Sequence, residues 1–247
     1  LAAVPEIELA LTTNGLLLGR FAERLSAAGL DRVTVSLDSL DDGIFRRMND
    51  VEFSVEQVLE GVAAAAAAGL TPVKINVVVL RGVNEGAVVD MARRFHGSGH
   101  IVRFIEYMDV GNTNGWELDQ VVTGAEMLER LQAEMTLEPI EPAYPGEVAR
   151  RWRHTDGGGE IGIITSVSRP FCGDCTRARL SAEGRLFTCL FAAEGLDLRG
   201  PLRDGATDQE IRAVLVERWS RRADRYSEQR SEATRGLPRV EMSYIGG

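Results

Sequence analysis

The stretch that decides the fold is residues 73–80, VKINVVVL, an apolar run of strand length. Comparable runs stand at 6–13 (EIELALTT), 32–38 (RVTVSLD) and 101–108 (IVRFIEYM), and helical patterns separate them. One of these helices starts at a capping box, Ser54 with Gln57, and ends at Gly69. Strands that alternate with helices at this spacing predict parallel βα units, in an open sheet or in a barrel.

Polar side chains interrupt all four predicted strands, with Thr12 and Ser36 on the first two and Lys74 and Arg103 on the others. A buried charge is costly unless it meets a partner, and parallel βα folds bind their ligands at strand ends. For one such residue, a strand cap or an internal ion pair is the simpler interpretation. For four neighbouring strands we favour a shared ligand cleft.

The chain changes character between about 136 and 160, where PIEPAYPG and DGGGE indicate a linker and a hairpin. We therefore predict two domains, 1–135 and 136–247. The second is expected to hold a strand over 160–167, a segment with all three cysteines, and a helix near 208–220 that Thr207 and Glu210 cap.

Composition excludes several functional classes. The net charge of −9 makes the surface repel nucleic acid, so an anionic ligand needs a local cluster of Arg or Lys. No apolar run approaches the length of a membrane span, and no secretory signal opens the chain. We expect a cytoplasmic protein without nucleic-acid or membrane partners.

The cysteine segment reads FCGDCTRARLSAEGRLFTCLF, a C-x2-C-x13-C pattern formed by Cys172, Cys175 and Cys189. A C-x2-C pair presents two thiolates from one tight turn, and a hairpin that turns at 182–184 would bring the third cysteine back beside it. We favour an iron–sulfur cluster, because three cysteines leave one iron open to another ligand. A zinc site with His154, a redox pair and three unrelated thiols are the alternatives.

Arg177 and Arg179 follow the first two cysteines, and on a strand both would point to one face. Two guanidinium forks beside a metal centre in an acidic protein suggest a phosphate-bearing ligand. The simpler alternative is that both pair with Asp or Glu.

Several motifs resemble one family along essentially the whole chain: LTTNG at 11–15, VSLDSLD at 35–41, VKINVVVLRGVN at 73–84, RFIEYMDVGNTNGW at 103–116, the cysteine segment, and the terminal Gly246-Gly247. That family is MoaA, the radical S-adenosylmethionine GTP 3′,8-cyclases of molybdenum cofactor biosynthesis. The resemblance implies an α/β fold, with a partial (β/α) barrel (the last four of six strands) and a small C-terminal α+β region that carries an Fe–S cluster.

The resemblance also assigns residues. Cys172, Cys175 and Cys189 would hold a [4Fe–4S] cluster, and Thr12, Lys74, Arg177, Ala178 and Arg179 would contact GTP. Ser36 and Met108 would contact S-adenosylmethionine, and Gly246 and Gly247 would reach into the active site as catalytic residues. The product would be (8S)-3′,8-cyclo-7,8-dihydroguanosine 5′-triphosphate. A homodimer and a separate downstream pterin-synthesis protein are the partners that the family implies.

The chain departs from the family pattern at one point. A second [4Fe–4S] cluster of the family needs a C-x3-C-x2-C motif, which these 247 residues lack. We therefore expect a form without the N-terminal radical-generating segment, inactive by itself. A GTP-binding Fe–S module without catalysis and a related peptide-modifying radical enzyme are the alternative functions.

Overall fold

The structure, a computed structural model, describes residues 3–230 and 239–245. Internal contacts divide the chain into two compact units. The first contains Leu1–Tyr107 and Leu118–Ser168, and the second contains Met108–Glu117 and Arg169–Gly247. Within the described residues, no helix is long and apolar enough to cross a membrane.

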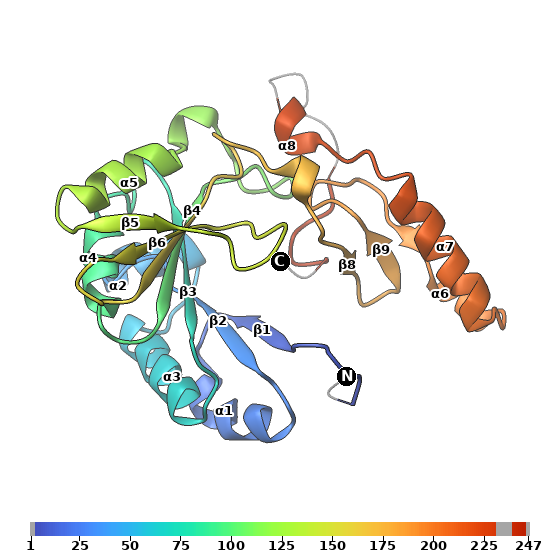
Figure 1. Cartoon of the computed structure of the whole chain (residues 1–247), viewed down its shortest axis with the longest axis horizontal. Helices are drawn as coiled ribbons and strands as arrows, with labels where there is room; N and C mark the ends of the chain where they lie inside the picture. The colour runs from blue at the N-terminus through green and yellow to red at the C-terminus, as the bar shows by residue number, and fades with distance from the viewer. Residues whose placement is uncertain (1–2, 231–238, 246–247) are drawn as a thin grey trace. The chain divides into compact units, whose positions relative to one another are not determined.

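The first unit is built on a seven-stranded sheet in the order β1-β2-β3-β4-β7-β6-β5 (Figure 1). The first five strands in this order are parallel, and β6 and β5 close the edge as antiparallel strands. The bounds are β1 Ala10–Thr13, β2 Arg32–Ser36, β3 Lys74–Val79, β4 Ile101–Glu106, β5 Leu137–Ile140, β6 Arg150–His154 and β7 Glu160–Ile164.

Five α-helices and a short 3-10 helix belong to the same unit, and α1, α3, α4 and α5 lie along one side of the sheet (Figure 1). Capping boxes start α3 at Ser54 and α5 at Thr123, as the sequence predicts. The bounds are α1 Leu18–Ala27, α2 Asp42–Asn49, α3 Val55–Ala67, α4 Ala87–Phe95, η1 Leu118–Gln120 and α5 Gly124–Gln132.

The two faces of the sheet differ in chemistry. Along β3, Ile75, Val77 and Val79 are buried in the core, whereas Lys74 and Asn76 face the other way and are partly exposed. Successive residues of a strand point to opposite faces, so the apolar face packs against helices and the other stays polar. This polar face is where a ligand of the first unit can meet charged groups.

A buried carboxylate joins three segments of the first unit. Glu106, the last residue of β4, is fully buried, and its side chain accepts hydrogen bonds from the backbone N–H groups of Gly124, Val167 and Ser168 at 2.7, 2.7 and 2.8 Å. The Ser168 hydroxyl donates a further bond. One side chain therefore fixes both the start of α5 and the chain after β7.

In its described residues, the second unit contains a three-stranded antiparallel sheet in the order β10-β9-β8, with a short 3-10 helix and three α-helices. Its α7 starts at the capping box of Thr207 and Glu210, as predicted. The bounds are η2 Cys172–Asp174, β8 Arg179–Leu180, β9 Arg185–Phe187, β10 Leu196–Asp197, α6 Arg199–Arg203, α7 Asp208–Ser220 and α8 Tyr226–Gln229.

The α/β class, the four βα strands and their parallel pairing are confirmed. The strand predicted over 160–167 is β7, but it pairs with β4 in the first sheet and does not belong to the cysteine region. Its β-branched run is buried on both faces, which suits a central parallel strand. The first compact unit therefore ends at Ser168. The predicted domains, 1–135 and 136–247, stay a prediction.

The close approach of α1 and α3 depends on Gly61. A Cβ at this position would stand 2.4 Å from the Gly15 carbonyl oxygen and 3.2 Å from the Leu18 Cβ. We expect Gly61→Ala to lower the free energy of unfolding by about 1–3 kcal/mol, because the two segments must separate. Gly19→Ala in exposed α1 is the control: its Cβ meets no atom within 4 Å, so a gain of about 0.5–1 kcal/mol is expected. Equal effects in urea unfolding would contradict this account.

Replacing Glu106 by Ala leaves the buried Gly124 N–H and the partly buried N–H groups of Val167 and Ser168 without their acceptor. A buried unsatisfied donor costs about 1–3 kcal/mol, and water can reach a partly buried one in part, so we expect Glu106→Ala to lower the free energy of unfolding by about 2–3 kcal/mol. Glu106→Gln keeps the volume and one carbonyl oxygen and is expected to cost less. Urea unfolding of both variants measures the difference, and a loss below about 1 kcal/mol for the Ala variant contradicts the assigned role.

Candidate functional site

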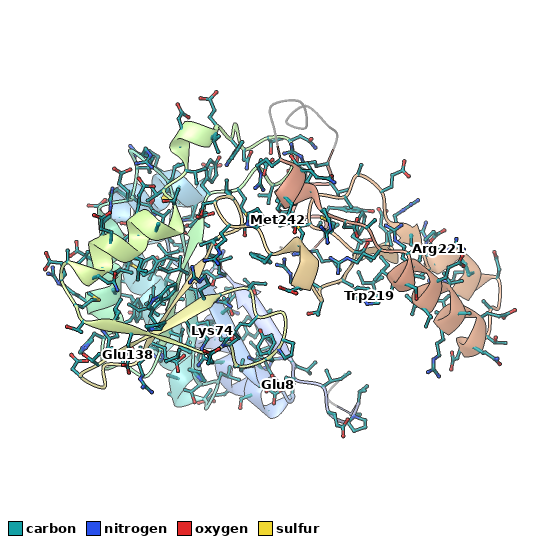
Figure 2. All side chains as sticks on the ribbon, turned by 45° about the horizontal axis from the view of Figure 1, so that its top comes forward. Glu8, Lys74, Glu138, Trp219, Arg221 and Met242 are labelled. Carbon is teal, nitrogen blue, oxygen red and sulfur yellow. The ribbon has the colours of Figure 1, made fainter. Side chains whose placement is uncertain are left out.

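The polar face of the first sheet aligns predicted site residues by register. Thr12 is paired with Thr34, and Thr34 with Lys74, so the three form one row across β1, β2 and β3. A second row on the same face joins Ser36, Asn76 and Arg103. Thr12, Ser36 and Lys74 therefore share one surface of the first unit, which the strand pattern predicted only in outline. Figure 2 labels Lys74 on this sheet.

One cation of this face, Arg103, is held by neutral partners. The Arg103 Nε donates to Asn76 Oδ1 at 2.9 Å, and its Nη2 lies 3.5 Å from the Thr34 hydroxyl. Burial lowers the pKa of Lys74, and the positive charge of Arg103 lowers it further. Lys74 and Arg103 line a small pocket with Tyr144 and Glu147. The arrangement leaves net positive charge on the face, which suits an anionic ligand.

The second unit places the cysteines at a turn and a hairpin. Cys172 opens η2, and the Cys175 N–H donates to the Cys172 carbonyl, so the C-x2-C pair forms the predicted tight turn. The strands β8 and β9 form the predicted hairpin, with Gly184 at a φ of +80° in its turn. Cys189 follows β9, close enough to the other two thiols for their charges to act on it.

The electrostatics of the three thiols differ. Burial raises the pKa of Cys189, and the neighbouring Cys172 and Cys175 add to this effect. Burial also raises the pKa of Cys175, but hydrogen bonds from Arg222 and Arg177 outweigh it and bring the value to about 7. Arg177 Nε lies 3.3 Å from the Cys175 sulfur, and the Phe191 N–H lies 3.4 Å from the Cys189 sulfur. These donors favour thiolates.

Arg177 and Arg179 are both half-buried and alternate with the exposed Thr176 and Ala178. Arg177 lies over the Phe171 ring at 5.1 Å. Burial lowers the pKa of Arg179, and the charge of Arg177 lowers it further. Among the described residues, neither guanidinium forms an ion pair with Asp or Glu, so the simpler alternative of the sequence analysis is not what the structure has.

Arg222 is a support that the sequence analysis missed. Its guanidinium donates to the Cys175 carbonyl and lies 3.3 Å from the Asp224 carboxylate, which in turn accepts a 2.6 Å hydrogen bond from Thr188. Thr188 directly precedes Cys189, so this chain of contacts connects the two ends of the cysteine segment. A single arginine in a charged stretch carries no sequence signal for such a role.

Asp109 forms a second support, also unpredicted. It is buried and accepts hydrogen bonds from the Tyr226 hydroxyl at 2.6 Å and from Arg230 Nε at 2.8 Å, and Arg239 Nη1 lies 3.3 Å away. Arg230 also lies over the Phe191 ring at 5.3 Å. The residue before it, Met108, accepts a bond on its carbonyl from Asn114. The available signal was an acid inside the string RFIEYMDVGN, which is part of a motif that resembles the family.

The three cysteines fit an iron–sulfur cluster better than one zinc ion. A tetrahedral zinc site brings thiolate sulfurs to about 3.8 Å from one another. In the described part of the chain, the group whose ligand atoms all lie within 4.8 Å is His96, His154 and Asp156, and the cysteines form no such group. Three half-buried free thiols with donors on their sulfurs suit the wider cluster. His154, the fourth ligand of the zinc alternative, belongs to the first unit, whereas the three cysteines belong to the second.

Gly246 and Gly247, the predicted catalytic residues, lie outside the described residues. The nearest described position, Ile245, is buried, and the hydroxyl of Tyr244 donates to Glu183. The chain that leads to the terminus is therefore anchored within the second unit.

Comparisons with known proteins cover the whole chain. The Radical SAM superfamily profile matches residues 1–95, and the Molybdenum Cofactor Synthesis C profile matches residues 100–228. A GTP 3′,8-cyclase of Acidothermus cellulolyticus is 49% identical over 273 residues, covering 100% of this chain and 75% of that protein. One of Xanthomonas campestris is 52% identical over 248 residues, covering 100% and 73%.

The chain belongs to the MoaA family of GTP 3′,8-cyclases. Membership in the radical SAM superfamily implies a [4Fe–4S] cluster and S-adenosylmethionine as cofactors. Among solved structures, a radical SAM methyltransferase of Sphaerobacter thermophilus matches 50% of this chain and 37% of its own, at 17% identity and a TM-score of 0.41.

The Asp109 contacts predict a large stability effect. Asp109→Asn removes the negative charge that faces two buried guanidinium groups, and an uncompensated buried charge costs about 3–5 kcal/mol. We expect a loss of about 3 kcal/mol in the unfolding of the second unit, measured by urea titration. Asp204→Asn, an exposed acid of the same unit, is the control and is expected to stay within about 0.5 kcal/mol. A neutral Asp109 variant contradicts the assigned support.

Proposed function

We propose that the chain acts in molybdenum cofactor biosynthesis as part of a GTP 3′,8-cyclase, which converts GTP with S-adenosylmethionine to (8S)-3′,8-cyclo-7,8-dihydroguanosine 5′-triphosphate. Because these 247 residues lack the C-x3-C-x2-C motif, we propose that they bind GTP but are inactive by themselves. One observation carries the substrate assignment: Arg177 and Arg179 are half-buried beside the cysteines and have no carboxylate partner within the described ranges. Two guanidinium groups without a carboxylate partner suit an anionic ligand, and a triphosphate is such a ligand. Membership in the family of GTP 3′,8-cyclases is the reason for assigning this triphosphate to GTP.

Cys172, Cys175 and Cys189 are the residues that would hold a [4Fe–4S] cluster in this unit. When bound on three cysteines, such a cluster offers one iron with an open coordination position, which suits a purine heteroatom. Arg177 and Arg179 would then orient the triphosphate, with Ala178 between them leaving the backbone accessible. Fixing both ends of the nucleotide limits its orientation, and positioning of this kind supplies much of the catalysis.

The first unit contributes the other proposed contacts. Thr12 and Lys74 stand in one register row and would bind GTP, and Ser36 stands in the next row on the same face and would bind S-adenosylmethionine. Lys74 has no carboxylate ion pair among the residues that the structure describes, which suits a phosphate contact. Met108, Gly246 and Gly247 stay in the proposed site by resemblance.

Homodimerisation, a downstream pterin-synthesis partner and a cytoplasmic location stay predictions. The matching relatives bear the cyclase name, so we do not propose a peptide-modifying enzyme. A GTP-binding module without catalysis forms neither 5′-deoxyadenosine nor the cyclised nucleotide, so an assay for these two products decides between the alternatives.

The arginine pair gives the direct test. Arg177→Ala and Arg179→Ala are each expected to weaken GTP binding about 10- to 100-fold, because a charge-assisted hydrogen bond contributes about 1.5–3 kcal/mol. Equilibrium dialysis of the anaerobically reconstituted chain with GTP measures the change. Arg212→Ala, in exposed α7, is the matched control and is expected to bind GTP normally.

The iron content of each variant separates two roles. If iron and sulfide per chain stay at the unmutated level while GTP affinity falls, the arginines act on the nucleotide. If iron is lost together with GTP affinity, they act in building the cluster site. Unchanged GTP affinity in both variants contradicts the substrate assignment.

A further inference from the structure

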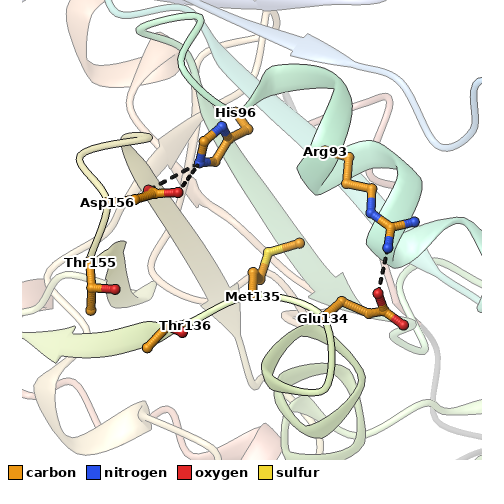
Figure 3. Close-up of a pocket in the computed structure, with 7 residues that line it drawn as sticks. All are labelled: Arg93, His96, Glu134, Met135, Thr136, Thr155 and Asp156. Carbon is orange, nitrogen blue, oxygen red and sulfur yellow. Dashed lines mark hydrogen bonds and ion pairs between the residues drawn. The ribbon is translucent and has the colours of Figure 1, made fainter.

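A group of three potential ligands lies in the first unit and plays no part in the proposed reaction. His96 caps the C-terminus of α4, His154 ends β6, and Asp156 stands in the turn that leads to β7. One ligand atom from each lies within 4.8 Å of the others. His96 Nε2 is 3.0 and 3.1 Å from the two Asp156 carboxylate oxygens, as the dashed lines in Figure 3 show.

We propose that His96, His154 and Asp156 form a binding site for a divalent transition-metal ion, with Zn²⁺ as its representative. Ligand atoms 2.0–2.1 Å from a tetrahedral zinc are about 3.3 Å apart, close to the His96–Asp156 separation. Two imidazoles and one carboxylate are a donor set that suits Zn²⁺, Ni²⁺ or Cu²⁺, whereas Mg²⁺ and Ca²⁺ prefer oxygen ligands. Three protein ligands leave a fourth position for water.

The environment of His154 supports the assignment. Its ring is 4% exposed and meets the His96 ring edge-on at 4.6 Å between centroids. Neither of its ring nitrogens has a hydrogen-bond partner among the residues that the structure describes. A metal ion shared with His96 and Asp156 would give this imidazole a polar partner within the protein.

Contacts between the end of α4 and the β6–β7 turn hold these side chains in place without a bound ion. Gly158 lies against His96, and a Cβ there would be 1.9 Å from Nε2. The Gly158 N–H donates to Asp156 Oδ1 at 2.9 Å, and its carbonyl accepts from the Gly97 N–H at 2.8 Å. The end of α4 and the β6–β7 turn are thereby fixed to each other, so little ordering is needed for binding.

The site opens into a pocket of about 370 Å³, lined by Arg93, Glu134, Met135, Thr136 and Thr155 in addition to His96 and Asp156 (Figure 3). Arg93 and Glu134 neutralise each other at 2.5 Å. Asp156 therefore supplies the local negative charge, which favours a cation. The pocket gives an ion access from solvent and leaves space for its fourth ligand.

The test is a Zn²⁺ titration by calorimetry on the full chain after anaerobic iron–sulfur reconstitution, so that the thiolates are already occupied. We expect one Zn²⁺ per chain. His96→Gln and Asp156→Asn change exposed side chains, and each is expected to weaken Zn²⁺ binding at least tenfold. Glu134→Gln removes a carboxylate from the same pocket and is the matched control, with unchanged affinity. Mg²⁺ at equal concentration is expected not to compete.

Gly158→Ala separates the site geometry from its chemistry. It keeps all three ligands but displaces His96, and we expect it to weaken Zn²⁺ binding at least tenfold. Thermal unfolding gives a second readout: Zn²⁺ raises the midpoint of the unmutated chain and of Glu134→Gln, but not that of His96→Gln. The proposal is overturned if the chain binds no Zn²⁺. It is also overturned if His96→Gln and Asp156→Asn leave Zn²⁺ binding unchanged while Cys189→Ser abolishes it. Neither outcome bears on GTP binding, so this test stands apart from that of the proposed function.

Discussion

The first unit depends on the Glu106 carboxylate at the end of β4. Its oxygens accept hydrogen bonds from the backbone N–H groups of Gly124, Val167 and Ser168, of which the first bond is buried and the other two are partly buried. A buried carboxylate is tolerated only when such donors surround it. Because the donors come from the start of α5 and from the chain after β7, this one carboxylate joins both segments to the end of β4. The sheet that carries the polar face is thereby fixed at this end.

Register converts that sheet into a binding surface. The two rows that run across the parallel strands put Thr12, Thr34 and Lys74 on one line and Ser36, Asn76 and Arg103 on the next. A shift of one residue in any strand would send its polar side chains into the apolar core. The valines and isoleucines that alternate with them therefore hold the polar residues in place, and the hydrophobic pattern sets the position of the charged groups.

The sequence predicts local features well and distant pairings poorly. Capping boxes at Ser54, Thr123 and Thr207 and the hairpin at Gly184 depend on neighbouring residues, and all are found. The strand after residue 160 is found too, but nothing in its own letters says that it pairs with β4. The supports Arg222 and Asp109 bond to partners 47 and 121 residues away, beyond the reach of any spacing rule. The cysteine trio was accessible because its spacing is itself the signal.

Charge pairing separates the arginines of the second unit into two groups. In the first group, Asp224 pairs with Arg222, and Asp109 pairs with both Arg230 and Arg239. The protein itself therefore neutralises these three guanidinium groups. Arg177 and Arg179 face the thiols and an aromatic ring, and within the described chain no carboxylate pairs with either. In a protein with nine more acids than bases, partners for two arginines are not scarce. Their lack of one supports the proposal that these two arginines bind the phosphates of the ligand.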